Sequence, residues 1–154
     1  MRVLIAAFAC WLAAAAAWAE CREDVAELRG PWGQARFRVE LAMTPEARMQ
    51  GLMFRESMSA GAGMLFIYPQ PQPRIGFWMK NTLIPLDILF FDASGTLRAR
   101  HLMAVPGDLT HLDGGSDIQY VLEVAGGVAR DMGINLGTQL RHPMIDPDRA
   151  AWSC

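Results

Sequence analysis

The sequence predicts a β-rich α+β domain, with about six or seven strands in a strongly bent or barrel-like antiparallel sheet and two short helices. Three observations predict this class. Short apolar stretches recur along the chain and are separated by glycine, proline and aspartate turns. Signals for helix formation occur in only two places. Hydrophobic residues make up 52% of the 154 residues, which is enough for one well-packed core.

The first elements follow a stretch of little periodicity at residues 20–34, which we expect to be an N-terminal extension. Apolar and charged residues then alternate at 37–41, which predicts a half-buried strand. The Thr-Pro-Glu sequence that begins at Thr44 supplies a capping hydroxyl, a first-turn proline and a first-turn acid. A short helix is therefore expected from there to about Leu52.

The rest of the chain reads as strands joined by turns. A continuous apolar run at 63–68 predicts a buried strand that the following prolines end. Asp-Ala-Ser-Gly at 92–95 predicts a hairpin turn, and the polar, glycine-rich stretch 104–117 predicts a binding loop or a mobile one. The remaining expected elements are strands at 74–80, 83–91, 96–103, 118–124 and 138–142, and a short helix at 126–132.

Residues 1–19 have the three parts of a secretory signal peptide. Arg2 precedes a run of apolar residues, and Ala-Trp-Ala ends that run at Ala19. We expect cleavage after Ala19 and a periplasmic or secreted location. The alternative is an uncleaved anchor, for which this run has about the minimum length that spans a bilayer.

Cleavage leaves 135 of the 154 residues, which suits a single domain at 35–142 followed by a C-terminal tail at 143–154. The leader carries one charge, so its removal shifts the net charge from −2 to −3. The remaining chain has no run of Lys or Arg. These features argue against nucleic acid as a partner, and we expect no membrane association after cleavage.

Cys21 and Cys154 stand at the two ends of the cleaved chain, whereas Cys10 leaves with the leader. Two cysteines in an oxidising compartment predict a disulfide, and the termini of a compact domain often lie close together. The alternative is two free thiols on frayed tails.

Six short strings of residues recur in one known family. They are Gly51-Leu52-Met53-Phe54-Arg55, Gly63-Met64-Leu65-Phe66, Phe77-Trp78-Met79-Lys80-Asn81-Thr82, Ile84-Pro85-Leu86-Asp87, Tyr120-Val121-Leu122-Glu123 and Met132-Gly133-Ile134-x-x-Gly137. With these strings the chain resembles the DUF192 family, also called UPF0127. The resemblance covers roughly residues 39–140 and implies a small, β-rich, often exported domain without an established activity. Two positions depart from the usual pattern: Gly137-Thr138, where many relatives have Gly-Asp, and Pro106-Gly107, where many have a cysteine after the proline.

The segment around Trp78 predicts a ligand-binding site. In a strand, Trp78, Lys80 and Thr82 would share one face, where the indole could hold a sugar ring or an acyl chain and the ammonium a carboxylate or phosphate. The competing interpretation is a core strand in which Lys80 pairs with Asp87 or Glu123. The full set of proposed ligand-binding residues is Arg55, Trp78, Lys80, Asn81, Thr82 and Asp87.

Two members of this set also have structural interpretations. Arg55 could bind an anion or cap the end of the first helix. Asp87 stands in an apolar strand, where an acid has either a structural partner or a raised pKa that suits a general base.

A copper carrier is an alternative function. His101 with Met103, and His142 with Met144, form His-x-Met pairs, and imidazole and thioether ligands suit Cu(I). Methionine is also ordinary core filler, which explains the ten methionines of the chain without any metal. We therefore expect no cofactor, with copper as the alternative.

Enzyme motifs are absent from the sequence, which contains no nucleophile elbow, no His-Glu-x-x-His and no phosphate-binding loop. A hydrolase centred on the 104–117 loop, with His111 near Asp108 and Asp113, is a third possibility. The sequence favours a non-enzymatic module that binds a small molecule or a protein.

Overall fold

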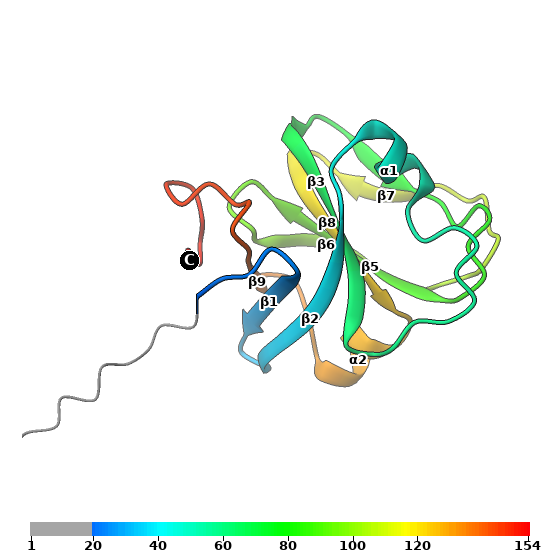
Figure 1. Ribbon diagram of the computed structural model, residues 1–154, viewed down its shortest axis with the longest axis horizontal. Coiled ribbons are helices and arrows are strands. Elements are labelled where there is room, and N and C mark those ends of the chain that lie inside the picture. Colours follow the sequence, from blue (N-terminus) through cyan, green and yellow to red (C-terminus); the bar gives the residue numbers. More distant parts are fainter. Residues whose placement is uncertain (1–19) are drawn as a thin grey trace, which may run out of the picture.

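Seven strands form one curled sheet in the order β6-β5-β8-β3-β2-β1-β9 (Figure 1). The computed structural model describes residues 20–154, so the expected signal peptide lies outside the described residues. Two short strands, β4 (Ile75–Phe77) and β7 (Leu112–Gly115), form a separate pair. The main sheet contains β1 (Val25–Gly30), β2 (Gly33–Ala42), β3 (Ala62–Gln72), β5 (Leu86–Asp92), β6 (Leu97–Ala104), β8 (Ile118–Ala125) and β9 (Gln139–Arg141). With two short helices, this confirms the predicted fold class.

Neighbouring strands are antiparallel except for β2 and β3, which run parallel with Leu41 opposite Leu65. A parallel pair needs a crossover connection. That crossover contains α1 (Pro45–Gln50), whose N-terminus is capped as the sequence predicts: the Thr44 hydroxyl accepts the Ala47 N–H at 3.1 Å. The helix ends at Gln50, two residues before the expected Leu52.

The 20–34 stretch, expected as an extension with little periodicity, contributes β1 to the main sheet. β1 pairs with both β2 and β9, and its Leu28 is fully buried. The tail is held beside it, because the guanidinium groups of Arg29 and Arg141 each lie 4.5 Å from the centre of the Trp152 ring. The predicted disulfide joins Cys21 to Cys154, with 5.8 Å between their Cα atoms.

β3 continues beyond the point where prolines were expected to end it. Its regular pairing with β8 ends at the pair Ile67–Tyr120. The next pair is Gln72–Ile118, so the register shifts between these two pairs. Pro69 and Pro71 stand within this irregular stretch, where the missing backbone N–H groups do not interrupt a regular ladder.

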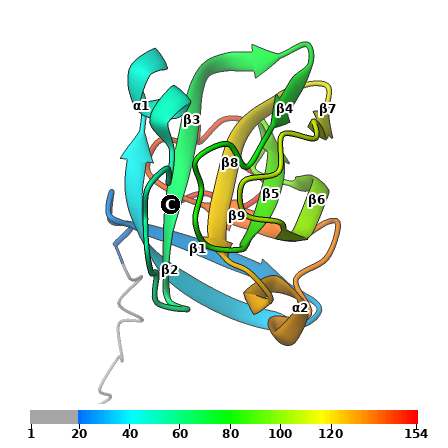
Figure 2. The ribbon, with the colours of Figure 1, turned by 90° about the vertical axis from the view of Figure 1, so that its right-hand side faces the viewer.

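The two faces of the curled sheet carry separate apolar cores, because successive side chains of a strand point to opposite faces. Along β8, Tyr120 and Leu122 join the first core, whereas Val121 joins the second with Phe66 and Phe90. Figure 2 shows α1 and the β4–β7 pair at one end of the molecule and α2 (Val128–Met132) at the other. The second core therefore lies under the end of the molecule that carries α1.

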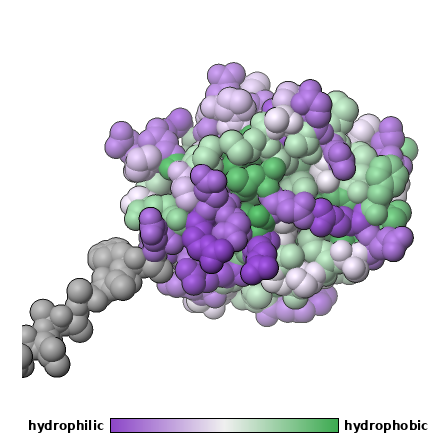
Figure 3. All heavy atoms as spheres, in the orientation of Figure 1, coloured by the Kyte–Doolittle hydropathy of each residue, from purple (hydrophilic) through white to green (hydrophobic). Residues whose placement is uncertain are grey.

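The surface over β1 and β2 is charged. Figure 3 shows hydrophilic side chains gathered over these strands. Arg36, Arg38 and Glu40 are exposed there, alternating with the buried Phe37 and Val39 as the sequence predicts. Among residues 20–154, none of the helices has the length and apolar character that crossing a bilayer demands.

Candidate functional site

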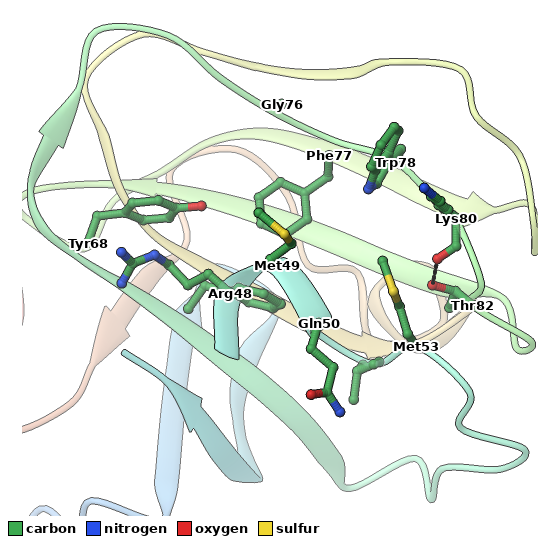
Figure 4. A pocket seen from close by; sticks show the side chains of 13 residues that line it. Arg48, Met49, Gln50, Met53, Tyr68, Gly76, Phe77, Trp78, Lys80 and Thr82 are labelled. Atoms are coloured by element: carbon green, nitrogen blue, oxygen red, sulfur yellow. Dashed lines mark hydrogen bonds between the residues drawn. The ribbon is translucent and has the colours of Figure 1, made fainter. Parts of the chain in front are cut away.

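A hollow of about 130 Å³ lies between two parts of the chain (Figure 4). One part is α1 and the turn that follows it, and the other is the segment 76–82. Its walls combine aromatic rings and methionine side chains with two cationic groups. The lining residues are Arg48, Met49, Gln50, Gly51, Leu52, Met53, Phe66, Tyr68, Gly76, Phe77, Trp78, Lys80 and Thr82.

The first wall is the end of α1. The Met49 side chain is 76% exposed, and no residue of this helix is buried. Gly51 ends the helix with φ 48° and ψ −135°, a conformation that favours glycine. The chain then turns so that Met53 also lines the hollow.

The second wall begins where β4 ends at Phe77. The strand expected to reach Lys80 stops there, because the next residues form a turn: Met79 donates its N–H to Asp108 O at 2.9 Å and accepts the Thr82 N–H at 3.1 Å. Met79 is buried, whereas Trp78 is 49% exposed. The expected alternation of faces is therefore replaced by a turn that presents Trp78 and Lys80 outward.

Cationic groups lie at both ends of the hollow. Figure 4 shows Arg48 and Tyr68 at one end and Trp78 and Lys80 at the other, with Phe77 and Met49 between them. The Arg48 guanidinium lies 4.7 Å from the Tyr68 ring centre and donates to Ile67 O at 3.0 Å. The Lys80 ammonium lies 5.2 Å from the Trp78 ring centre, and no residue from 20 to 154 forms an ion pair with it.

Three of the expected ligand-binding residues, Trp78, Lys80 and Thr82, line this hollow. Asn81 stands at its edge, where its amide contacts Met53 Sδ at 3.9 Å. Arg55 lies apart from it and forms a two-point ion pair with Glu40, with N–O distances of 2.7 Å. This contact holds the pKa of the Glu40 carboxyl below its usual value.

Asp87 is fully buried and takes no part in the hollow. Its Oδ1 accepts N–H groups of Met103 at 2.8 Å and Gly127 at 3.0 Å, and its Oδ2 accepts the Ala129 N–H at 2.8 Å. The carboxylate therefore has backbone partners at both oxygens, the structural interpretation that the sequence left open.

Sequence reasoning missed one whole wall of the hollow and the acid behind it. Arg48, Met49 and Tyr68 were not among the expected ligand-binding residues, because only the fold brings α1 and β3 beside Trp78. Glu123 is 4% exposed, and burial raises the pKa of its carboxyl to about 8. A lone acid within the apolar strand of residues 118–124 was the available signal for it.

The 104–117 stretch, expected as a loop, contains the strand β7, which pairs with β4. A Cβ on Gly76 would come within 1.9 Å of the His111 ring, so this ring lies directly against the Gly76 backbone. Hydrogen bonds from Thr110 lower the pKa of Asp108, and Asp113 contacts Arg74 at 3.6 Å. Hydrolysis by this loop stays a prediction.

The His-x-Met pairs have hydrogen-bonded rings. Nε2 of His101 contacts Asp113 O at 2.9 Å, and Nε2 of buried His142 contacts Glu23 O at the same distance. Nδ1 of His142 accepts the Met144 N–H at 3.2 Å, so both nitrogens of this ring have partners. Within residues 20–154 no cluster of three His, Cys, Asp or Glu side chains could hold a metal, and copper binding stays a prediction.

Comparison with known proteins identifies relatives over most of the chain. Residues 28–142 match DUF192, described as an uncharacterized ACR. Comparison with curated proteins finds no match. A crystal structure of a protein of unknown function from Novosphingobium aromaticivorans is 37% identical, with a TM-score of 0.73, covering 75% of this chain and 82% of that one. A crystal structure of a putative transcription regulator from Sinorhizobium meliloti is 36% identical, with a TM-score of 0.73, covering 78% and 93%. The chain belongs to the DUF192 family.

Proposed function

We propose that the protein is an exported binding module whose hollow holds the apolar part of a small organic anion, with the anionic group near Lys80. One observation carries this proposal: an ammonium without an ion-pair partner in residues 20–154 lies over a half-exposed indole at the mouth of a hollow lined by aromatic and methionine side chains. Apolar walls with a few placed polar groups are typical of small-molecule sites.

The volume limits the size of the ligand. A cavity of about 150 Å³ holds one benzene-sized molecule, and this hollow has about 130 Å³. One ring or one short branched chain therefore fits inside, and the rest of the ligand would extend into solvent past Trp78. Sugar polymers and nucleotides are too large to be enclosed there.

Charge favours a small anion over nucleic acid. The chain has 14 basic and 16 acidic residues, and it has no basic stretch that could follow a phosphate backbone. The name of the Sinorhizobium meliloti relative, a putative transcription regulator, therefore does not extend to this chain in our proposal.

Export is the other half of the proposal. The leader-like sequence of residues 1–19 supports it. A disulfide between the two ends of the cleaved chain also supports it, since such bonds persist in oxidising compartments.

The test uses methionine methyl groups as reporters, because Met49 and Met53 line the hollow. The probe is 6-methylheptanoate, a carboxylate on a short branched chain, titrated into protein labelled with ¹³C at the methionine methyls. We expect shifts at Met49 and Met53 but not at Met144. Lys80→Gln should weaken binding by about threefold, the size of a partly exposed ion pair. The control Arg38→Gln removes an exposed charge on β2 and should leave binding unchanged. Unchanged Met49 and Met53 signals would contradict the proposal.

A further inference from the structure

Glu123 lies on the face of the sheet that carries the hollow. In β8 it stands opposite Met64 of β3 and Ile88 of β5, and all three belong to the layer that packs under α1. Phe66, two residues after Met64, is also a lining residue of the hollow. The strand register therefore places an acid directly beneath the candidate site.

The carboxyl group of Glu123 is buried without a partner for one of its oxygens. Among the described residues, nothing forms a hydrogen bond with its Oε2, which is shielded from solvent. Burial of a polar group without a hydrogen bond is unfavourable, because the lost hydration is not replaced. Its cross-strand partners, Met64 and Ile88, are apolar, and none of the described residues forms an ion pair with it. A polar group kept in such a position needs an explanation, and a ligand group supplies one.

Gly51 lies between this carboxyl group and the hollow. A Cβ built on Gly51 would stand 3.9 Å from Glu123 Oε2 and 3.2 Å from Phe66 Cζ. Gly51 and Phe66 both line the hollow, so Oε2 lies just behind its inner wall. Gly51 adds no side chain here, and the Phe66 ring is the side chain nearest to this position.

We propose that the Glu123 carboxyl is the inner polar contact of the hollow and selects a ligand whose apolar end carries an uncharged amide or carbonyl group. This inference rests on the proposed function. An amide pairs with a neutral carboxyl through two hydrogen bonds, since each partner offers one donor and one acceptor. The contact forms past the bare backbone of Gly51.

A charged group at the end of the ligand that reaches Glu123 would bind poorly. A carboxylate would meet the Glu123 carboxyl in a layer of apolar side chains, and its desolvation would be unfavourable. An ammonium would be opposed by Arg48 and Lys80, which stand at the two ends of the hollow. Tyr68, the remaining titratable group at the hollow, is neutral near pH 7, since its ordinary pKa is 10.0 and burial raises it further.

The test compares two probes of one shape: 6-methylheptanoate and adipamate, in which a primary amide replaces the terminal isopropyl group. Binding is followed at the Met49 and Met53 methyls at pH 6.5. We expect adipamate to bind about tenfold more tightly than the apolar probe, the gain of roughly one net hydrogen bond. Glu123→Gln should keep this preference, because an amide side chain also offers a donor and an acceptor. Glu123→Met should remove the preference while 6-methylheptanoate still binds.

A second readout separates this contact from a general effect of packing. Raising the pH from 6.5 to 9 ionises Glu123 and removes its donor, so that only the contact from the adipamate NH₂ group to the carboxylate remains. The preference for adipamate should therefore change with pH in the wild type but not in Glu123→Gln. Equal binding of the two probes to the wild type, or a preference that survives in Glu123→Met, would overturn the inference alone. If neither probe shifts the Met49 and Met53 signals, the proposed function fails and the inference fails with it.

Discussion

Oδ2 of Asp87 accepts the backbone N–H of Ala129 at 2.8 Å, which joins β5 to the first turn of α2 across 42 residues of sequence. Oδ1 of the same carboxylate accepts the N–H groups of Gly127 and Met103. A buried anion is stable only when hydrogen bonds replace its hydration. Three backbone N–H groups replace the hydration of Asp87. Those of Gly127 and Ala129 at the start of α2, and that of Met103 near the end of β6, gain a partner in return.

Asp87→Asn should lower the free energy of unfolding by about 2–4 kcal/mol. The amide keeps one acceptor oxygen but turns an NH₂ group toward a backbone N–H, so at least one bond to a charged acceptor becomes a contact between two donors. Urea denaturation measures the loss. The matched control is Asp148→Asn in the exposed tail, where a change within about 0.5 kcal/mol is expected. Equal stability of both variants would show that the Asp87 contacts contribute little.

The sequence predicted the strands whose pattern reflects one-sided burial or a tight turn. Alternation at 37–41 identified β2, and the Asp-Ala-Ser-Gly turn at 92–95 identified the β5–β6 hairpin. β1 was missed because its burial comes from pairing with both β2 and β9 and from the Trp152 contacts, which the local pattern does not contain. The parallel pairing of β2 with β3 was missed for the same reason.

The candidate site was predicted in part. Trp78 and Lys80 were chosen as two residues of a strand face, and they do line the hollow, but from a turn that the Asp108 carbonyl stabilises through Met79. The opposite wall, with Arg48 and Met49, depends on how α1 crosses the sheet. The orphaned oxygen of Glu123 depends on its neighbours in β3 and β5, and these relationships follow from tertiary contacts rather than from spacing in the sequence.

Protein produced with its leader in a bacterial host should be recovered from the periplasm with Glu20 as its first residue and with Cys21 joined to Cys154. The Ala-x-Ala end of the proposed leader sets the expected cleavage point, and the bond is expected because the Cα atoms of the two cysteines lie 5.8 Å apart. Intact-mass analysis after alkylation without reductant checks both points at once. A mass that includes residues 1–19, or one that includes two alkyl groups, would contradict the expectation.

Glu123 should make the protein less stable as the pH rises toward 8. Burial raises the pKa of its carboxyl from 4.5 in the unfolded chain to about 8 in the folded protein, so folding takes up a proton between these values. Stability falls with pH wherever the folded state binds more protons, by up to about 1.4 kcal/mol per pH unit for one group. The penalty is absent below about pH 4.5, grows through this window and levels off above about pH 8.

Glu123→Gln isolates this effect, because the amide has a similar shape and does not titrate. The free energy of unfolding of the wild type minus that of the variant should fall by about 2–3 kcal/mol between pH 5.5 and 8, measured by urea denaturation.

His142 acts in the opposite direction: burial lowers its pKa, so stability is lost as the pH falls below the 6.5 of the unfolded chain. Both proteins contain His142, and the difference between them cancels its contribution. Parallel pH profiles would mean that Glu123 is ionised in the folded protein at neutral pH, which would also remove the hydrogen-bond donor that the two-point contact with an amide requires.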